Sequence, residues 1–286
     1  MKLLDFCVEY LDYAQQFQKT TYNHKKRICR RILKAWGGET PVENISSLMC
    51  KKFFQNQARQ RTANAANEDR KHLSTVFQYA VDFYDLERNP VSSTKPMPCE
   101  HRDLYTPTKE EVEKLKAVSH GPDRTMLFCF LYTAARRSEI FRLKWGKDID
   151  LQGRGIRLGT RKNKSGDMRY DWLHMADPLH ESLTWLKNNR RFPRSPFVFV
   201  NERNGKGFGQ PFSRRPGFIP GLCKKARVKK FGFHALRRYV ASELIRTPGV
   251  SLKDVQDVLR HSAIASTERY IKNIGEKKAG NVLKKL

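Results

Sequence analysis

The sequence lacks the patterns that mark secreted, membrane-spanning and zinc-binding proteins. Its six cysteines form no Cys-x-x-Cys pair, so neither a zinc site nor a disulfide framework is predicted. The longest apolar stretch, Met126–Tyr132, is far shorter than the roughly 20 residues that a membrane-spanning helix needs. The N-terminal segment MKLLDFCVEYLDY has no apolar signal-peptide core. These absences predict a cytoplasmic protein that makes no contact with a membrane.

Acidic residues are scarce as well. The chain has 29 Asp and Glu against 56 Lys and Arg, which gives a formal net charge of +27. The excess is not confined to a tail, because residues 1–99 already hold 16 basic and 10 acidic side chains. Such a charge favours a polyanionic partner, and double-stranded DNA is the natural one, since neutralised phosphates release counterions. A merely solvated basic surface is the alternative.

The first 90 residues read as a helical bundle. Apolar residues recur at helical spacing in four segments, and the second segment stops at Gly37-Gly38. Three prolines and two serines follow from Pro90 to Pro98, so we expect a linker over 91–106. The predicted division is therefore a DNA-binding domain at 1–90, the linker, and a second domain at 107–286.

The second domain changes character along its length. Thr108 to Glu111 forms a capping-box pattern before an amphipathic helix, and Met126–Ala135 reads as a buried helix. Ile156–Leu158 and Tyr170–Met175 look like two short strands around the polar loop Thr160–Asp167. The predicted fold class is therefore mainly α with a small β-sheet (α+β).

Five polar segments of this domain carry side chains suited to phosphate chemistry. Arg136 emerges from an apolar segment and needs an anionic partner, for which Glu139 and a phosphate are alternatives. The loop between the strands carries Lys162 and Lys164, either of which can donate a proton. The alternative is that the loop is only a solvated basic turn. His234 and Arg237 are three positions apart, on one face of a helix.

The last two segments are Leu259-Arg260-His261 and Ser266–Tyr270. His261 and Tyr270 lie nine residues apart. A phenol becomes a useful nucleophile only where nearby cations stabilise both its anion and the scissile phosphate. Tyrosine alone carries little weight, because most tyrosines fill a core or a surface.

Taken in order, these segments resemble the tyrosine recombinase (phage integrase) family over nearly the whole chain. The resemblance implies a helical core-binding domain, followed by a catalytic domain with a C-terminal tail. It rests on TAARRSE, the KSG hairpin, HALRR, LRH and TERY. The implied catalytic residues are Arg136, Lys164, His234, Arg237, His261 and Tyr270.

Several positions depart from the family pattern. Ala134 and Arg260 stand where glycine is usual, and Arg238 stands where histidine is frequent. Arg260 therefore implies either a different backbone or a contact with DNA. Lys162 competes with Lys164, which we prefer because Lys-Ser-Gly matches the family's Lys-Thr-Gly better. No departure removes a chemical group that the reaction needs.

The resemblance implies a site-specific recombinase or integrase that cuts and rejoins DNA through a 3′-phosphotyrosyl intermediate. It needs no cofactor and no metal, and it acts in the cytoplasm of a bacterial host, associated with the nucleoid. The expected partners are double-stranded DNA and a homotetramer assembled on it. The tail Ile271–Leu286 either docks on a neighbouring protomer or packs on its own domain.

Three rivals remain. A type IB-like topoisomerase would also use a tyrosine and arginines, but the hairpin and the spacing from His261 to Tyr270 fit recombinases better. A non-catalytic DNA-binding protein would use the same basic surface without chemistry. A metal-dependent nuclease is the weakest rival, because the sequence shows no carboxylate cluster and no ligand spacing.

Overall fold

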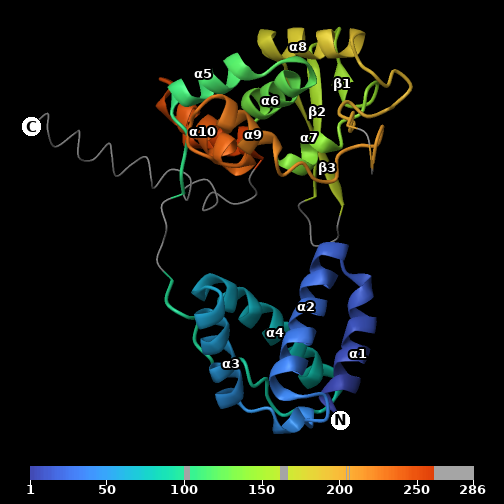
Figure 1. The fold of residues 1–286 in the computed structure, drawn as a ribbon, viewed down its shortest axis with the longest axis vertical. Helices are drawn as coiled ribbons and strands as arrows, with labels where there is room; N and C mark the ends of the chain where they lie inside the picture. The colour runs from blue at the N-terminus through green and yellow to red at the C-terminus, as the bar shows by residue number, and fades with distance from the viewer. Residues whose placement is uncertain (100–103, 162–166, 204, 206, 261–286) are drawn as a thin grey trace, which may run out of the picture. The chain divides into compact units, whose positions relative to one another are not determined.

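A computed structural model describes residues 1–99, 104–161, 167–203, 205 and 207–260. The chain divides into two compact units, Met1–Arg102 and Asp103–Leu286, here called unit 1 and unit 2. Both are shown in Figure 1. The predicted fold class is confirmed, since the chain is mainly helical with one small sheet. No described helix is both long and apolar enough to span a bilayer.

Unit 1 is a bundle of four α-helices with two short 3-10 helices. Its core is built from one apolar side of each helix, with Phe6, Ile32, Phe53 and Phe77 among the buried residues. The elements are α1 (Leu3–Tyr13), η1 (Ala14–Gln16), α2 (Lys19–Trp36), η2 (Val42–Asn44), α3 (Ser47–Gln60) and α4 (Ala63–Phe83).

The segment after α4 stays attached to unit 1 as far as Cys99. The amide of Met97 donates to the side chain of Asn67 on α4 at 2.7 Å, and Arg70 donates to the carbonyl of Thr94 at 2.9 Å. Val91 is fully buried in the core of the bundle. Much of the proline-containing stretch therefore packs on unit 1, and the domain boundaries at 90 and 107 stay a prediction.

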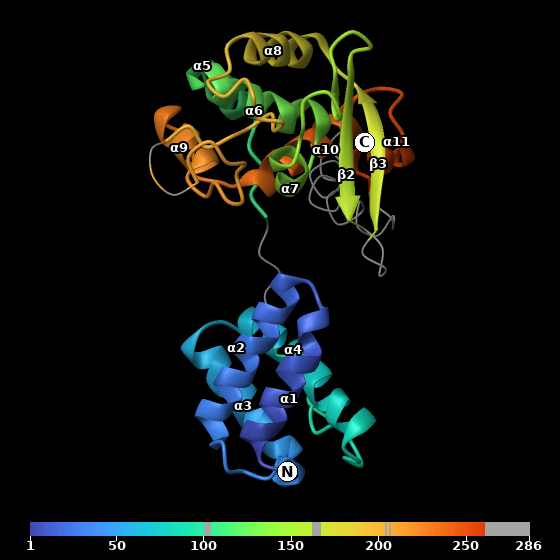
Figure 2. The same cartoon turned by 90° about the vertical axis from the view of Figure 1, so that its right-hand side faces the viewer.

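Unit 2 places helices around a three-stranded antiparallel sheet of order β1-β2-β3. Figure 2 shows β2 and β3 as a pair of strands running side by side. The elements are α5 (Lys109–Val118), α6 (Gly121–Thr133), α7 (Arg137–Phe141), β1 (Ile149–Asp150), β2 (Gly155–Arg161), β3 (Met168–His174), α8 (Asp177–Asn188), α9 (Phe218–Lys225), α10 (Phe233–Arg246) and α11 (Leu252–Leu259).

The helices and strands predicted for unit 2 are present in the structure, with small changes in their bounds. The capping box at Thr108 and Glu111 starts α5, and α6 is buried almost all round, as its apolar sequence predicts. The strands extend further into the expected loop, since Thr160 pairs with Arg169 and is 3% exposed. Strand β1 was not predicted, because two residues are too short to show a pattern.

Candidate active site

Arg136 lies in the sharp turn between α6 and α7. Helix α6 ends at Thr133, and the next residue, Ala134, has a left-handed φ of 48° that turns the chain out of the helix. The amide of Arg136 donates to Oε2 of Glu139 at 2.8 Å, and its Nη1 donates to Oε1 at 3.1 Å. The Arg136 side chain is 31% exposed. The guanidinium group is thus anchored from one side and accessible from the other.

Glu139 gathers donors from three separate elements. Its carboxylate also accepts a hydrogen bond from Oγ1 of Thr160 on β2 at 2.6 Å, and one from Nη2 of Arg260 at 2.9 Å. Burial on its own would raise the pKa of Glu139, but Arg260, Thr160 and Arg136 together hold it below the ordinary value. Glu139 is therefore an anion at neutral pH, and it is the partner of Arg136 in the free protein.

His234 and Arg237 lie on α10, as their spacing predicts. Arg237 is only 2% exposed, and its two terminal nitrogens donate to the carbonyls of Ala134 and Leu259. It therefore joins the turn before Arg136 to the end of α11. Burial, reinforced by Arg237 and further arginines, lowers the pKa of His234 below 6.5. The imidazole is thus neutral at pH 7 and able to accept a proton.

A pocket of about 550 Å³ opens at this place. Its charged lining consists of Arg136, Arg137, Lys230 and Arg238, and His234 lies in the same wall. None of the described residues that line it is acidic. A concave site whose walls carry several cations and no carboxylate is suited to a phosphate group.

The structure thus brings three of the six predicted site residues to one place. Arg136 and His234 line the pocket, and Arg237 lies behind it, bonded to the backbone beside Arg136. Lys164, its rival Lys162, His261 and Tyr270 lie outside the described residues.

Other residues of this site were missed or misread from the sequence. Lys230 and Arg238 line the pocket, although Lys230 lies in no motif and Arg238 was noted only as a departure from the family's frequent histidine. The expectation that Arg260 contacts DNA is wrong for the free protein, because its side chain is buried against Glu139. The φ of Arg260 is 52°, in the left-handed region that glycine favours, so the expectation of a different backbone gains no support. The only sequence clue to the buried Arg260 was its place at a position where the family usually has glycine.

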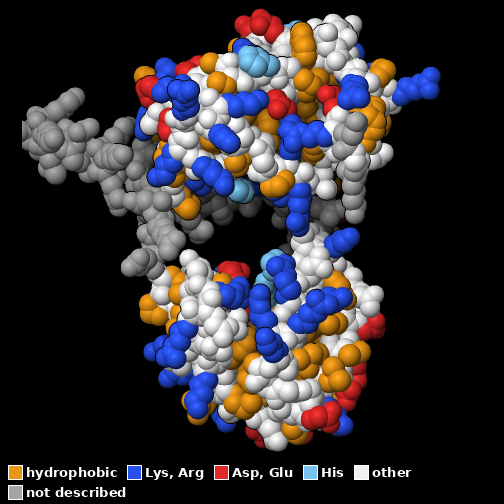
Figure 3. Space-filling model, viewed as in Figure 1, with side chains coloured by type: hydrophobic (Ala, Val, Ile, Leu, Met, Phe, Trp, Pro, Cys, Tyr) orange, Lys and Arg blue, Asp and Glu red, His pale blue; other side chains and the backbone are white. Residues whose placement is uncertain are grey.

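Within the described residues, no three His, Cys, Asp or Glu side chains gather as a metal ion would require. The surface is basic on both units, and Figure 3 shows one face of each on which Lys and Arg predominate over Asp and Glu. The site is therefore built from cations, and the groups able to bind a phosphate are arginine, lysine and histidine side chains.

Comparison with known proteins agrees with this geometry. A profile of the phage integrase family matches residues 106–276, which is more than half of the chain and includes all six predicted site residues. The chain therefore belongs to the phage integrase family. The predictions of a tyrosine recombinase and of a site-specific recombinase activity are thereby confirmed.

Curated relatives align along most of the chain. A tyrosine recombinase XerC-like protein of Caldanaerobacter subterraneus subsp. tengcongensis is 26% identical over 273 residues, which cover 82% of this chain and 68% of the relative. A tyrosine recombinase of Thermosipho africanus is 23% identical over 296 residues, which cover 100% of this chain and 99% of the relative.

Two solved structures share the fold. The Tn1549 transposon integrase in complex with transposon right end DNA is 17% identical, with a TM-score of 0.77, and the match covers 94% of each chain. A lambda integrase dimer bound to a COC′ core site is 18% identical, with a TM-score of 0.76, covering 94% of this chain and 95% of that one.

Proposed function

We propose that this recombinase cuts and rejoins double-stranded DNA by metal-independent transesterification, with Tyr270 as the nucleophile. The phenolic oxygen attacks the phosphorus, the bond to the 5′-oxygen breaks, and a 3′-phosphotyrosyl link and a free 5′-hydroxyl result. The energy of the phosphodiester is kept in the covalent link, so neither ATP nor a metal is needed. The observation that carries the proposal is the cationic pocket that Arg136 and His234 share.

Each group has a role that follows from its chemistry. Arg136 and Arg237 neutralise the charge that develops on the non-bridging oxygens. His234, whose lowered pKa leaves it neutral, accepts the proton of Tyr270. Lys164 protonates the leaving 5′-oxygen, and His261 donates a hydrogen bond to the phosphate.

The basic surfaces of both units serve the backbone of the duplex. Contacts to phosphate give register and a steep dependence of affinity on salt. A reaction that exchanges four strands needs four active sites, and lambda integrase has been solved as a tetramer bound to a Holliday junction. We therefore include in the proposal a homotetramer assembled on DNA, in which the tail Ile271–Leu286 contacts a neighbouring protomer.

The test is a search for a covalent adduct between protein and DNA. The protein is incubated in EDTA with a pool of nicked duplexes that have a randomised core, and adducts are isolated on denaturing gels. We expect adducts with the parent protein, none with Tyr270→Phe, and parental amounts with Tyr170→Phe, which removes the hydroxyl of an exposed tyrosine on β3.

Three results would contradict the proposal. The first is a parent protein that forms no adduct with any duplex of the pool, which would indicate a protein that only binds DNA. The second is a Tyr270→Phe variant that reacts like the parent. The third is relaxation of supercoiled plasmid without exchange of strands between two copies of the duplex that is selected from the pool by adduct formation. That result would indicate a topoisomerase.

A further inference from the structure

A buried ion pair joins three segments of the site that are far apart in the sequence. Arg260 and Glu139 are separated by 121 positions, and their side chains are 3% and 1% exposed. Glu139 belongs to α7 and holds Arg136, Thr160 is the last residue but one of β2, and Arg260 follows α11. The chain continues from β2 toward Lys164, and from Arg260 directly to His261.

Arg260 is held on several sides. Its Nη2 donates to Glu139 at 2.9 Å, and its Nη1 donates to the carbonyl of Val258 at 3.0 Å and approaches that of Thr133 at 3.4 Å. These contacts connect the end of α11 to the end of α6 and to α7. A lysine at this position could not reproduce them, because its ammonium group is a compact point charge on a flexible stem.

Stability alone is a poor reason for such a pair. Removing two charges from water costs nearly as much as their attraction returns, so an apolar pair of the same volume is often as stable. The backbone adds a further cost, since Arg260 has a φ of 52°, where a residue with a side chain is strained and glycine is not. The guanidinium group must therefore contribute something other than stability.

We propose that Arg260 is a positioning residue of the cleavage reaction, which fixes Glu139 and thereby orients the guanidinium group of Arg136 toward the phosphate. This inference rests on the proposed function, because it assigns Arg260 to the same reaction. Arg260 acts on the phosphate only through Glu139 and Arg136, because its own charge is paired with the carboxylate of Glu139.

The pair also gives the reaction a particular response to pH. The charged groups facing Glu139 among the described residues are Arg136 beside α7 and Arg260 after α11, while Asp171 on β3 acts on Arg260. In an Arg260→Gly variant, burial still raises the pKa of Glu139, and the stronger of the two cationic contributions that lower it is gone. Glu139 then takes up a proton at a higher pH than in the parent, and its hold on Arg136 weakens.

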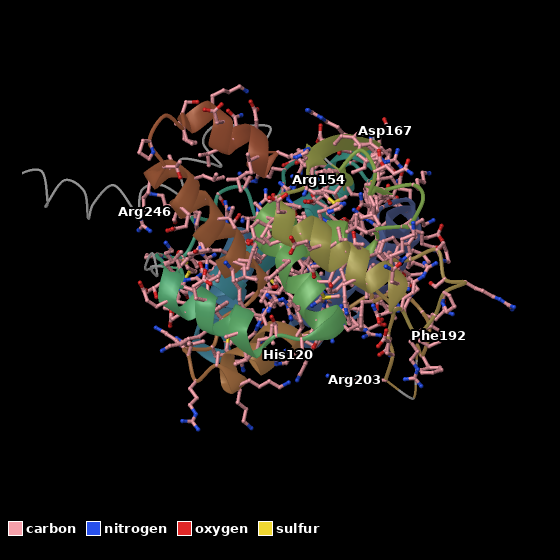
Figure 4. All side chains as sticks on the ribbon, turned by 90° about the horizontal axis from the view of Figure 1, so that it is seen from above. His120, Arg154, Asp167, Phe192, Arg203 and Arg246 are labelled. Atoms are coloured by element: carbon pink, nitrogen blue, oxygen red, sulfur yellow. The ribbon has the colours of Figure 1, made fainter. Side chains whose placement is uncertain are left out.

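Arg154 offers a matched control. It is an arginine of the same unit, it has the same left-handed φ of 52°, and it pairs with an acidic residue, Asp177 at the start of α8. Its side chain is 39% exposed, and Figure 4 shows it beside α8. Arg260→Gly and Arg154→Gly therefore relieve the same backbone strain, and only the first removes the buried guanidinium group.

The experiment measures single-turnover adduct formation on the selected nicked duplex as a function of pH, at saturating protein. We expect Arg260→Gly to lower the rate on the order of 10²-fold, as a small misplacement of reacting groups does. Its loss of rate on the acidic side should begin at a higher pH than in the parent, while affinity for the duplex is unchanged. Arg154→Gly should match the parent in rate, in pH dependence and in affinity for the duplex.

Two further measurements distinguish a positioning role of Arg260 from a general effect on folding. Arg260→Lys retains the charge, so it should lose rate without moving the acidic limb. Amide hydrogen exchange of free Arg260→Gly should rise at residues 133–139 relative to Arg154→Gly, whether or not DNA is cut.

The two proposals fail in different ways. If the parent forms adducts but Arg260→Gly keeps the parental rate and pH profile, the positioning role is wrong and the proposed function stands. If Tyr270→Phe reacts like the parent, the proposed function is wrong, and the hydrogen exchange then shows only whether the buried pair orders the turn. A loss of thermal stability with no change in the pH profile would also contradict the positioning role.

Discussion

Arg237 donates hydrogen bonds to the carbonyl of Ala134, 103 positions earlier, and to the carbonyl of Leu259, 22 positions later. Arginine has five N–H donors in a rigid fork, so one side chain can hold two backbone segments and still present a cationic group. The residue that would clamp the phosphate is therefore also part of the framework around the pocket. Structural and catalytic roles overlap in this side chain.

This overlap predicts a double defect in Arg237→Lys. A single ammonium group cannot bridge both carbonyls, so we expect the free energy of unfolding to fall by about 1–3 kcal/mol. The rate of adduct formation should fall by about 10²–10³. Urea unfolding measures the free energy, and single-turnover cleavage measures the rate of adduct formation. The control is Arg246→Lys at the exposed end of the same helix (Figure 4), where Arg246 pairs with Glu243 and the change should have little effect. A stable, fully active Arg237→Lys would contradict this account.

Ala134 predicts a gain in stability. It is fully buried at the end of α6, with a φ of 48°, where its Cβ strains the left-handed backbone. Ala134→Gly should relieve that strain and raise the free energy of unfolding by about 0.5–1 kcal/mol. The neighbouring Ala135 is also buried but has no positive φ, so Ala135→Gly should lower the free energy of unfolding. Equal losses from both substitutions would show that Ala134 is not strained.

The sequence predicted the helices and strands of the site better than the side-chain contacts between them. The apolar run Met126–Ala135 located α6, with Arg136 just beyond it, and the spacing of His234 and Arg237 placed both on one helix, α10. The partners of these side chains were harder to predict, because a hydrogen bond such as that from Arg237 to Ala134 joins distant segments and leaves no local pattern.

Arg260 illustrates the limit of sequence interpretation. Replacement of a usual glycine predicted either a different backbone or a contact with DNA, but the φ of Arg260 is one that glycine favours and its side chain is buried. Its side chain is buried against Glu139 of α7, which is itself hydrogen-bonded by Thr160 of β2. Only tertiary structure brings a carboxylate into a place where a buried cation is stabilised.

The pKa of His234 predicts the acidic limb of cleavage. Because burial and nearby arginines lower this pKa below 6.5, the imidazole stays neutral as the pH falls to that value and is protonated only further down. The adduct rate of the parent should therefore hold to below pH 6.5 and then fall. His234→Gln should be slower by about 10²–10⁴ and should lose the limb that His234 causes.

The control for this prediction is another histidine of unit 2. His180 on α8 contacts the carbonyl of Leu151 at 2.9 Å and does not line the pocket, so His180→Gln should keep the parental profile. A parental acidic limb that persists unchanged in His234→Gln would show that a different group accepts the proton.

Lys25 predicts a gain in stability in unit 1. It is 4% exposed on α2, and its ammonium group donates to the carbonyl of His72 at 3.3 Å and lies 5.9 Å from the ring of Tyr10. Burial lowers the pKa of Lys25 to about 8, well below that of a lysine in the unfolded chain. At pH 7 the folded protein therefore carries a buried charge that opposes folding, and this cost falls as the pH rises from about 8 to about 10.5.

Lys25→Met should remove that cost and raise the free energy of unfolding of unit 1 by about 1–3 kcal/mol at pH 7. The difference between variant and parent should shrink as the pH increases, because the parent lysine then loses its proton. Lys52→Met, on the exposed side of α3, is the control and should show neither effect. The measurement is urea unfolding of the full chain, followed by a tyrosine signal of unit 1, at several pH values. A pH-independent loss of stability in Lys25→Met would mean that the ammonium group is better satisfied than its burial implies.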